Sequence, residues 1–189
     1  MSFEQTLKLS PDRIGVLIGK GGKVKSEIEE RCSVSINVDG KTGEINIKSY
    51  GNPLEAEPFK AVNIVNAIAR GFSPLRALKL MNDNMFMHIL DLREYAGKSP
   101  NSIKRIKGRI IGFDGKSRRI VEEFTGASIS VYGHTVAIIG EVREAKLALD
   151  AVEELALGKT HKAVYNMLQR EKRKEKLNRM KLWEDESLE

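Results

Sequence analysis

A short glycine loop occurs twice in this chain and constrains its fold more than any other feature. Residues 18–22 read Ile-Gly-Lys-Gly-Gly and residues 111–115 read Ile-Gly-Phe-Asp-Gly, so two G-x-x-G motifs lie 93 positions apart. A charged segment and then a Ser-Ile-x-Val stretch follow each loop at matching distances, Ser35–Val38 in the first copy and Ser128–Val131 in the second. Because glycine has no Cβ, another backbone can approach it closely. The repeat therefore predicts a duplicated module whose loops contact a phosphate backbone.

Both halves show the same order of predicted helices and strands. The first half predicts a strand at 5–9, helices at 11–17 and 23–31, strands at 33–39 and 44–50, and a helix at 54–71. The second predicts a strand at 84–92, helices at 100–110 and 116–125, strands at 127–132 and 135–139, and a helix at 141–157. The β-α-α-β-β-α order is that of a type I KH domain, a module whose G-x-x-G loop clamps about four nucleotides.

The fold class expected is α+β, with two tandem type I KH domains that each have a three-stranded antiparallel sheet packed by helices. A short helix follows each module, at 75–81 and at 161–168. We expect the first domain, with its trailing helix, at 1–82, the second at 83–168, and a charged C-terminal helix or tail at 169–189. Trp183 lies between the basic part of the tail and its acidic end, and we interpret it as folding back on the body.

The charge of the chain is distributed unevenly. Lysine and arginine outnumber the acids by 32 to 26, a mild excess, but eight basic residues and only one acid lie between Lys98 and Arg119. A basic stripe of this kind is typical of a nucleic-acid surface, and here it surrounds the second glycine loop. The single cysteine excludes an internal disulfide, and no apolar run approaches the ~20 residues of a membrane span. We expect a soluble, cytoplasmic protein.

A catalytic site is difficult to build from this sequence. The three histidines, His88, His134 and His161, are scattered, without cysteines or carboxylates at metal-ligand spacing. Neither glycine loop has the spacing of a nucleotide-binding P-loop. The acidic pairs Glu29-Glu30 and Glu122-Glu123 recur, but we interpret them as solvated helix faces. The sequence therefore predicts no enzyme, no cofactor and no metal.

In each module we expect the loop and its two short helices to form a groove for single-stranded RNA. Loop glycines and neighbouring side chains are expected to hold phosphates and bases: Gly19, Lys20, Gly21, Gly22, Lys23 and Lys25 in the first copy, and Arg109, Gly112, Phe113, Gly115, Lys116, Arg118 and Arg119 in the second. The expected apolar floor consists of Ile14, Ile18, Ile28 and Ile36 in the first groove, and Ile106, Ile111, Val121 and Ile129 in the second. These floor positions are also ordinary core positions.

The two loops differ in their middle residues. The first has Lys20-Gly21, whereas the second has Phe113-Asp114, which places a carboxylate where a phosphate should pass. Either this carboxylate weakens the second groove, or the surrounding cations compensate while Phe113 stacks on a base, a contact that can contribute about 1–3 kcal/mol. We favour the second interpretation and expect the second groove to dominate.

The second loop and its flanks resemble a known family. The stretch Gly108–Arg118 is similar to the G-R-I-x-G-x-x-G-K-[ST]-[RK] signature of the partner-of-Nob-one, or Dim2-like, family of two-KH-domain proteins of small-subunit ribosome assembly. The segments Ala69–Pro74 and Leu155–Gly158 resemble further family motifs. The intact first loop fits the archaeal branch, whereas Phe113-Asp114 departs from the usual loop.

The resemblance implies a non-catalytic RNA-binding assembly factor in pre-rRNA processing, acting at the 3′ region of the small-subunit rRNA. Its expected partners are that rRNA, a Nob-type endonuclease and, as a second protein, a translation initiation factor. We expect a monomer that does not bind membranes. The alternative is a protein–protein adaptor that uses one KH domain to dock the endonuclease or the initiation factor.

Overall fold

The computed structural model describes residues 3–49, 56–97 and 99–186. It divides into two compact units, residues 1–87 and 88–189, which are described separately below. Some sequence expectations fall outside the described residues or side chains. Among them are Tyr50 at a strand end, Leu54 at a helix start, Lys98 in the basic stripe, and the side chains of Trp183 and of the acidic end of the tail.

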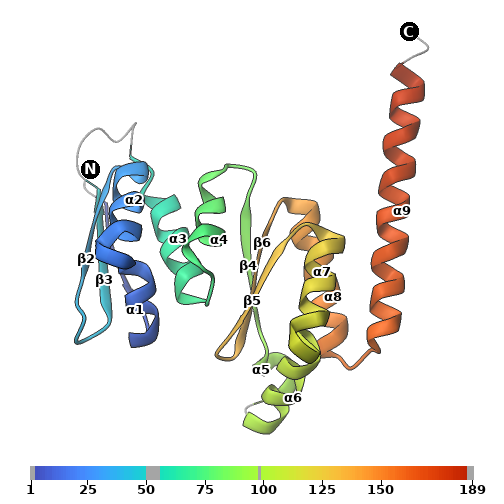
Figure 1. The fold of residues 1–189 in the computed structure, drawn as a ribbon, viewed down its shortest axis with the longest axis horizontal. Coiled ribbons are helices and arrows are strands. Elements are labelled where there is room, and N and C mark those ends of the chain that lie inside the picture. Colours follow the sequence, from blue (N-terminus) through green and yellow to red (C-terminus); the bar gives the residue numbers. More distant parts are fainter. Residues whose placement is uncertain (1–2, 50–55, 98, 187–189) are drawn as a thin grey trace. The chain divides into compact units, whose positions relative to one another are not determined.

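The first unit has the predicted β-α-α-β-β-α order (Figure 1). Its elements are β1 (Glu4–Lys8), α1 (Pro11–Ile18), α2 (Lys23–Cys32), β2 (Val34–Val38), β3 (Glu44–Ser49) and α3 (Pro58–Ala69), followed by α4 (Pro74–Ala77). A 3₁₀ turn at Lys20–Gly22 forms the glycine loop, and a second one, Leu78–Met81, follows α4. The strand order in the sheet is β1-β3-β2, with both pairings antiparallel.

The second module repeats this order. Its elements are β4 (Phe86–Asp91), α5 (Arg93–Ala96), α6 (Pro100–Ile111), α7 (Lys116–Thr125), β5 (Ser128–Tyr132), β6 (Thr135–Gly140), α8 (Val142–Ala156) and α9 (His161–Glu186). The strand order is β4-β6-β5, and Tyr132 pairs with Thr135 across the predicted two-residue turn. Two three-stranded sheets with this topology confirm the predicted fold class. The short helix α5 was not predicted.

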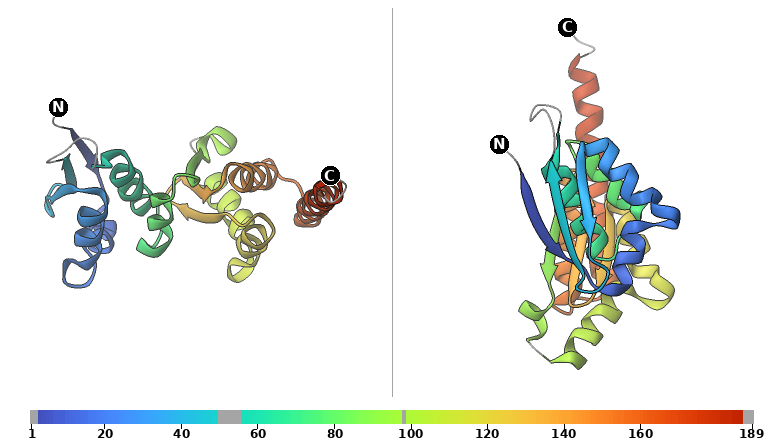
Figure 2. Two further views of the ribbon diagram at one scale, coloured as in Figure 1. Left: turned by 90° about the horizontal axis from the view of Figure 1, so that it is seen from above. Right: turned by 90° about the vertical axis from the view of Figure 1, so that its left-hand side faces the viewer.

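Alternating strand residues and helix faces form the core of the first unit. Ile36 on β2 and Ile45 and Ile47 on β3 are at most 1% exposed. The helices α1, α2 and α3 lie on one face of this sheet (Figure 2), and α2 and α3 contribute the fully buried Ile28 and Ile64. Burial of each such side chain contributes about 1.5–3 kcal/mol relative to exposure. This packing fixes α1 and α2, and therefore the loop between them.

The last helix is continuous. We expected a helix at 161–168 followed by a charged C-terminal helix or tail at 169–189, and α9 joins the two in one helix that reaches Glu186. Only its first turns are held by the core, through the buried side chains of Val164 and Leu168. Residues beyond Leu168 contain no glycine or proline and consist largely of Lys, Arg, Glu, Leu and Met, all strong helix formers. Intrinsic propensity therefore explains the continuation.

Cys32 is the last residue of α2 and lies in the core of the first unit. Its side chain is fully buried, and its thiol lies 3.6 Å from the sulfur of Met81. Burial and then the Glu57 carboxylate raise the pKa of this thiol to about 11. Because the thiolate is the nucleophilic form, a buried neutral thiol is inert.

We predict that a thiol reagent at pH 8 leaves Cys32 of the folded chain unmodified and labels it once the chain unfolds. Because the folded pKa is raised above the unfolded one, this group stabilises the fold fully below pH 9, and that contribution declines as the pH rises through 9 to 11. The labelling rate as a function of denaturant, followed by mass spectrometry, tests the first part. Rapid labelling without denaturant would contradict it.

Candidate nucleic-acid interface

The glycines at either end of the two G-x-x-G loops have matching backbone conformations. The first glycine has φ 70° and ψ −179° at Gly19, and φ 72° and ψ 177° at Gly112. The last has φ 80° and ψ 3° at Gly22, and φ 73° and ψ 14° at Gly115. Positive φ values of this kind are readily adopted by glycine alone. The two copies of the motif therefore build one loop geometry twice.

The third loop position explains how an aspartate enters the second copy. Gly21 has φ 64° and ψ 26°, and Asp114 has nearly the same values, φ 49° and ψ 28°. Aspartate is one of the few residues that visit this left-handed region. The neighbouring Phe113 is 87% exposed, so its ring is free to stack on a base. Asp114 thus preserves the backbone of the loop and changes its charge.

Only the first glycine of each loop is fixed by steric contact. A Cβ on Gly19 would lie 2.5 Å from Cγ2 of Val24, and one on Gly112 would lie 2.8 Å from the backbone nitrogen of Ser117. A Cβ on Gly22 would meet no atom within 4 Å. The loop therefore presses against the first turn of the helix that follows it, and its last glycine faces open space.

Each loop leads directly into a helix N-terminus without a side-chain cap. Gly22 is the N-cap of α2 and Gly115 that of α7, and neither helix start has a side-chain cap hydrogen bond. The first N–H groups of a helix have no partner within the helix and carry partial positive charge. Such an end is an anion-binding site, here placed beside a loop that admits a phosphate backbone.

A carboxylate ties each of these helices to the edge strand beside it. Oε1 of Glu29 accepts the backbone N–H of Ile36 on β2 at 2.7 Å, and Oε1 of Glu122 accepts that of Ile129 on β5 at the same distance. Both strands lie at the edge of their sheet, where these amides would otherwise lack a partner. The acidic pairs were expected to be solvated, so the role of their first members was missed; the recurring seven-residue spacing from Glu to Ile was the available signal.

Most of the expected floor residues belong to the core. Ile28, Ile36, Val121 and Ile129 are at most 1% exposed, and Ile14 and Ile106 are 7% and 5% exposed. Only Ile18 and Ile111, next to the loops, are partly exposed. Of the expected floor residues, these two are therefore accessible to a ligand, whereas the other six are buried.

Arg109, expected at the RNA, instead binds main-chain carbonyls inside the second unit. Its Nε donates to the carbonyl of Leu155 at 3.2 Å and its Nη2 to that of Lys159 at 2.6 Å, at the C-terminal end of α8. In the first unit, Nε of Arg13 donates to the carbonyl of Ile68 at 2.7 Å and Nη2 to that of Phe72. A cation at a helix C-terminus is favourable and satisfies carbonyls that lack a partner.

Some of the other cations expected to contact RNA have partners within the protein, and some have none among the described residues. Nζ of Lys25 lies 3.7 Å from the Glu29 carboxylate, Nη1 of Arg118 donates to the carbonyl of Ile129 at 3.4 Å, and Nη2 of Arg119 donates to that of Asp114 at 2.6 Å. Among the cations expected to contact RNA, Lys20, Lys23 and Lys116 are exposed and make no ion pair or hydrogen bond with another described residue. The free cations are thus two at the first loop and one at the second.

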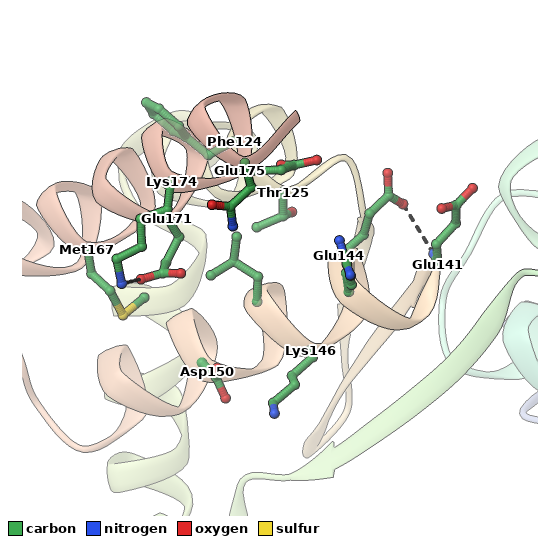
Figure 3. Close-up of a pocket in the computed structure, with 13 residues that line it drawn as sticks. Phe124, Thr125, Glu141, Glu144, Lys146, Asp150, Met167, Glu171, Lys174 and Glu175 are labelled. Atoms are coloured by element: carbon green, nitrogen blue, oxygen red, sulfur yellow. Dashed lines mark hydrogen bonds and ion pairs between the residues drawn. The ribbon is translucent and has the colours of Figure 1, made fainter. Parts of the chain in front are cut away.

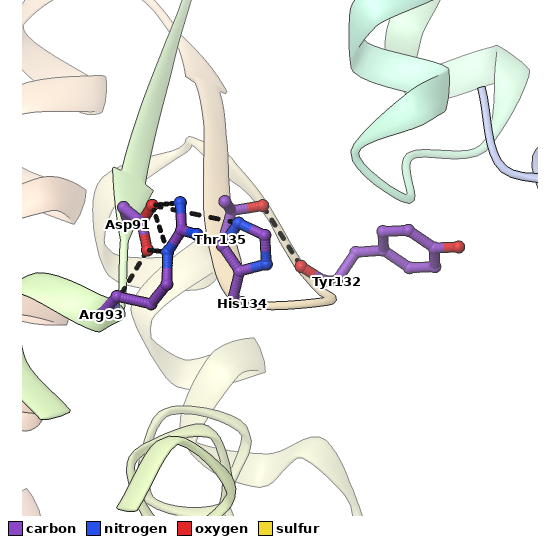
Figure 4. A network of polar contacts seen from close by, with 5 residues as sticks. All are labelled: Asp91, Arg93, Tyr132, His134 and Thr135. Atoms are coloured by element: carbon purple, nitrogen blue, oxygen red, sulfur yellow. Dashed lines mark hydrogen bonds and ion pairs between the residues drawn. The ribbon is translucent and has the colours of Figure 1, made fainter. Parts of the chain in front are cut away.

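A separate polar cluster joins the end of β4 to the β5–β6 turn (Figure 4). Asp91 accepts hydrogen bonds from the Arg93 side chain, and its Oδ2 lies 3.9 Å from Nε2 of His134. The Arg93 guanidinium lowers the pKa of Asp91 to about 2. The pair therefore remains ionised at neutral pH and holds the strand end.

The described part of the chain holds no group of three or more His, Cys, Asp or Glu side chains placed to bind a metal ion. Its helices are each too short or too polar to cross a membrane.

Comparison with known proteins matches both modules. A KH domain model covers residues 4–57, and a eukaryotic type KH-domain model (KH-domain type I) covers residues 86–173. A KH domain-containing protein of Methanocaldococcus jannaschii is 46% identical, over 97% of this chain and 80% of the relative. In a crystal structure of an a/eIF2alpha–aDim2p–rRNA complex from Pyrococcus horikoshii, one chain superposes with a TM-score of 0.84 at 44% identity, covering 92% of this chain and 96% of that chain.

The chain belongs to the Dim2 family. The resemblance to the partner-of-Nob-one family, and to its archaeal branch, is thereby confirmed. A pre-rRNA-processing protein PNO1 of Chaetomium thermophilum is 27% identical over 86% of this chain. This Dim2-type chain spans 63% of the length of that fungal relative.

We predict that Arg109→Ala lowers the free energy of unfolding by about 1–3 kcal/mol, because it leaves two main-chain carbonyls without their charged donor. Lys116→Ala should change stability by less than about 0.5 kcal/mol, as expected for an exposed side chain without a partner, yet should weaken RNA binding. Urea unfolding and RNA titration of both variants test this. Equal stabilities would show that Arg109 does not hold α8.

Proposed function

We propose that this protein is a single-stranded RNA-binding factor of small-subunit ribosome assembly that acts at the 3′ region of 16S-type rRNA. The observation that carries the proposal is the pair of G-x-x-G loops with one backbone geometry, each opening onto an uncapped helix N-terminus. The rRNA in the Pyrococcus complex and the pre-rRNA-processing role named for the Chaetomium relative support it.

We propose that the protein binds RNA and does not catalyse a reaction on it. Glycine main chain and the N-termini of α2 and α7 hold phosphates, and bases lie against the partly exposed Ile18 and Ile111. Contacts to phosphate give affinity and position, whereas contacts to base edges give sequence preference. The role proposed is therefore to hold the rRNA end in a defined place, in the cytoplasm, while other factors process it.

The double variant Gly22→Asp with Gly115→Asp tests this proposal. A Cβ on Gly22 meets no atom within 4 Å, and one on Gly115 lies 4.0 Å from Nη2 of Arg118. Aspartate adopts a left-handed backbone at the neighbouring loop position, Asp114, and we expect it to do so at these glycines as well. We expect the variant to remain folded and to bind a single-stranded oligonucleotide with the rRNA 3′-end sequence more than tenfold more weakly, because each carboxylate repels a phosphate. Unchanged affinity in a folded double variant would refute loop-led binding.

We infer that the first groove binds RNA more tightly than the second, which reverses the expectation from the sequence. That expectation counted Arg109 and Arg118 as available, but both donate to main-chain carbonyls. The first loop has two free lysines and no carboxylate, while the second has one free lysine beside Asp114. Gly22→Asp alone should therefore reduce affinity more than Gly115→Asp alone.

The middle residues of the loops offer a matched exchange. Gly21→Asp gives the first loop the carboxylate of the second, and no atom lies within 4 Å of the added Cβ. Asp114→Gly does the reverse. We predict that Gly21→Asp weakens RNA binding about fivefold and Asp114→Gly strengthens it, since one charge near a phosphate is worth about 1 kcal/mol in water.

Asp114→Asn is the control for the exchange, because asparagine keeps the left-handed backbone and the side-chain shape while removing the charge. It should behave like Asp114→Gly in the same RNA titration. If Asp114→Asn leaves affinity unchanged while Asp114→Gly raises it, flexibility of the loop and not charge sets the difference.

Two protein partners extend the proposal. The Pyrococcus complex holds a/eIF2alpha together with its Dim2 protein and rRNA, which supports an initiation-factor subunit as a partner here. A Nob-type endonuclease is the second proposed partner, and it would supply the catalysis that we propose this chain lacks. Co-sedimentation of purified endonuclease with the chain, with and without RNA, tests this partner.

A further inference from the structure

The helix α9 extends the RNA-binding side of the second unit. Nε2 of His161, in its first turn, lies 2.8 Å from the carbonyl oxygen of Arg109, next to the second glycine loop. Eleven residues later, Nζ of Lys172 lies 5.4 Å above the Phe124 ring, at the far end of α7. Thus α9 starts beside the loop, runs alongside α7 and continues past its end (Figure 1).

The described carboxylates of α9 and most of its described cations lie on different faces of the helix. Glu171 and Glu175 turn toward α8, where they line a groove of about 890 Å³ with Lys174 and Asp150, and Nζ of Lys174 lies 2.6 Å from Oε1 of Glu171 (Figure 3). At 3.6 residues per turn, the side of the helix opposite the buried Val164 and Leu168 defines its outer face. The outer face carries Lys162, Arg170, Arg173, Lys176, Leu177 and Met180.

The outer face is cationic and fully available. Lys162, Arg170, Arg173 and Lys176 are exposed and make no ion pair or hydrogen bond with another described residue. Every described carboxylate of α9 lies on the inner face. The four cations span 14 residues of regular helix, or roughly 21 Å. A row of this length without interspersed acids is electrostatically complementary to a phosphate backbone.

The composition of the outer face indicates which nucleic acid it fits. Surfaces for single strands combine cations with aromatic side chains on which bases stack. The nearest described aromatic residue, Tyr165, lies at the margin of this face, is only partly exposed and packs against His161. The apolar members of the face are Leu177 and Met180, which are 57% and 53% exposed. Double-stranded RNA, in contrast, is recognised largely through shape and backbone contacts. A rigid helix matches the fixed phosphates of such a stem.

We propose that the outer face of α9 binds the phosphate backbone of an RNA stem that flanks a single strand held at the second glycine loop. The inference rests on the proposed function, because the stem reaches α9 only if the strand joined to it is held at that loop, beside which α9 starts. The contact is independent of sequence. The cations Arg170, Arg173 and Lys176 add affinity. A stem bound by them lies along the outer face of α9.

The test compares two RNAs with the same single-stranded segment, one of them extended by a hairpin stem. The full chain should bind the stem-containing RNA more tightly and with a steeper salt dependence. The variant Arg170→Ala with Arg173→Ala and Lys176→Ala should lose this gain and keep its affinity for the unextended strand. The slope of log K against log salt for the stem RNA should fall by about 0.9 for each phosphate contact removed, the value for a duplex.

A matched control removes three exposed cations of the first unit, with Lys8→Ala, Lys41→Ala and Lys79→Ala. It has the same net charge as the α9 variant and should keep the stem-dependent gain. If the wild-type chain gains nothing from the stem, or both triple variants lose the gain equally, the inference is overturned, and an acidic protein surface becomes the candidate for this face. Failure to bind the unextended strand would instead contradict the proposed function.

Discussion

The architecture of both modules depends on one close contact, that between the first loop glycine and the start of the following helix. At Gly19 and Gly112 there is no space for a Cβ, because the backbone or side chain of the next helical turn occupies it. This contact forces the chain to turn sharply between two helices and leaves the last loop glycine facing solvent. A helix N-terminus, an open backbone and a partly exposed isoleucine then meet at one point. The proposed phosphate contact therefore depends on that geometry first and on the basic side chains second.

Charged side chains near the loops attach the two short helices of each module to the rest of the module. Arg13 and Arg109 fasten the first helix of each groove to the end of the long helix behind it. Glu29 and Glu122 fasten the second helix to the edge strand. These contacts hold the two short helices of each module against the long helix and the sheet. Arg109, which the sequence analysis placed at the RNA, thus uses its hydrogen bonds within the protein.

The fold was largely predictable from the sequence, whereas the roles of individual side chains were less so. Glycine spacing and strand alternation are local signals, and they predicted the order of elements and both loops. The partners of Arg109 lie 46 and 50 residues away, and no local pattern identifies them. Ile28 is buried and Ile18 is partly exposed, although both are apolar residues near a loop, and the sequence alone does not distinguish them. The length of α9 could have been inferred from propensity, since nothing after Gly158 breaks a helix.

The two arginine attachments show how the halves have diverged. The carbonyl acceptors keep a constant offset: Leu155 follows Ile68 by 87 positions, and Lys159 follows Phe72 by 87. The donors Arg13 and Arg109 differ by 96 positions, three more than the 93 that separate the loops, so the attachment comes from the neighbouring turn of the helix. Aligned by loop, Arg109 stands opposite Val16 and Arg13 opposite Ile106. The two halves therefore make the same attachment from different helix positions, so corresponding residues are better identified by their contacts than by their alignment in sequence.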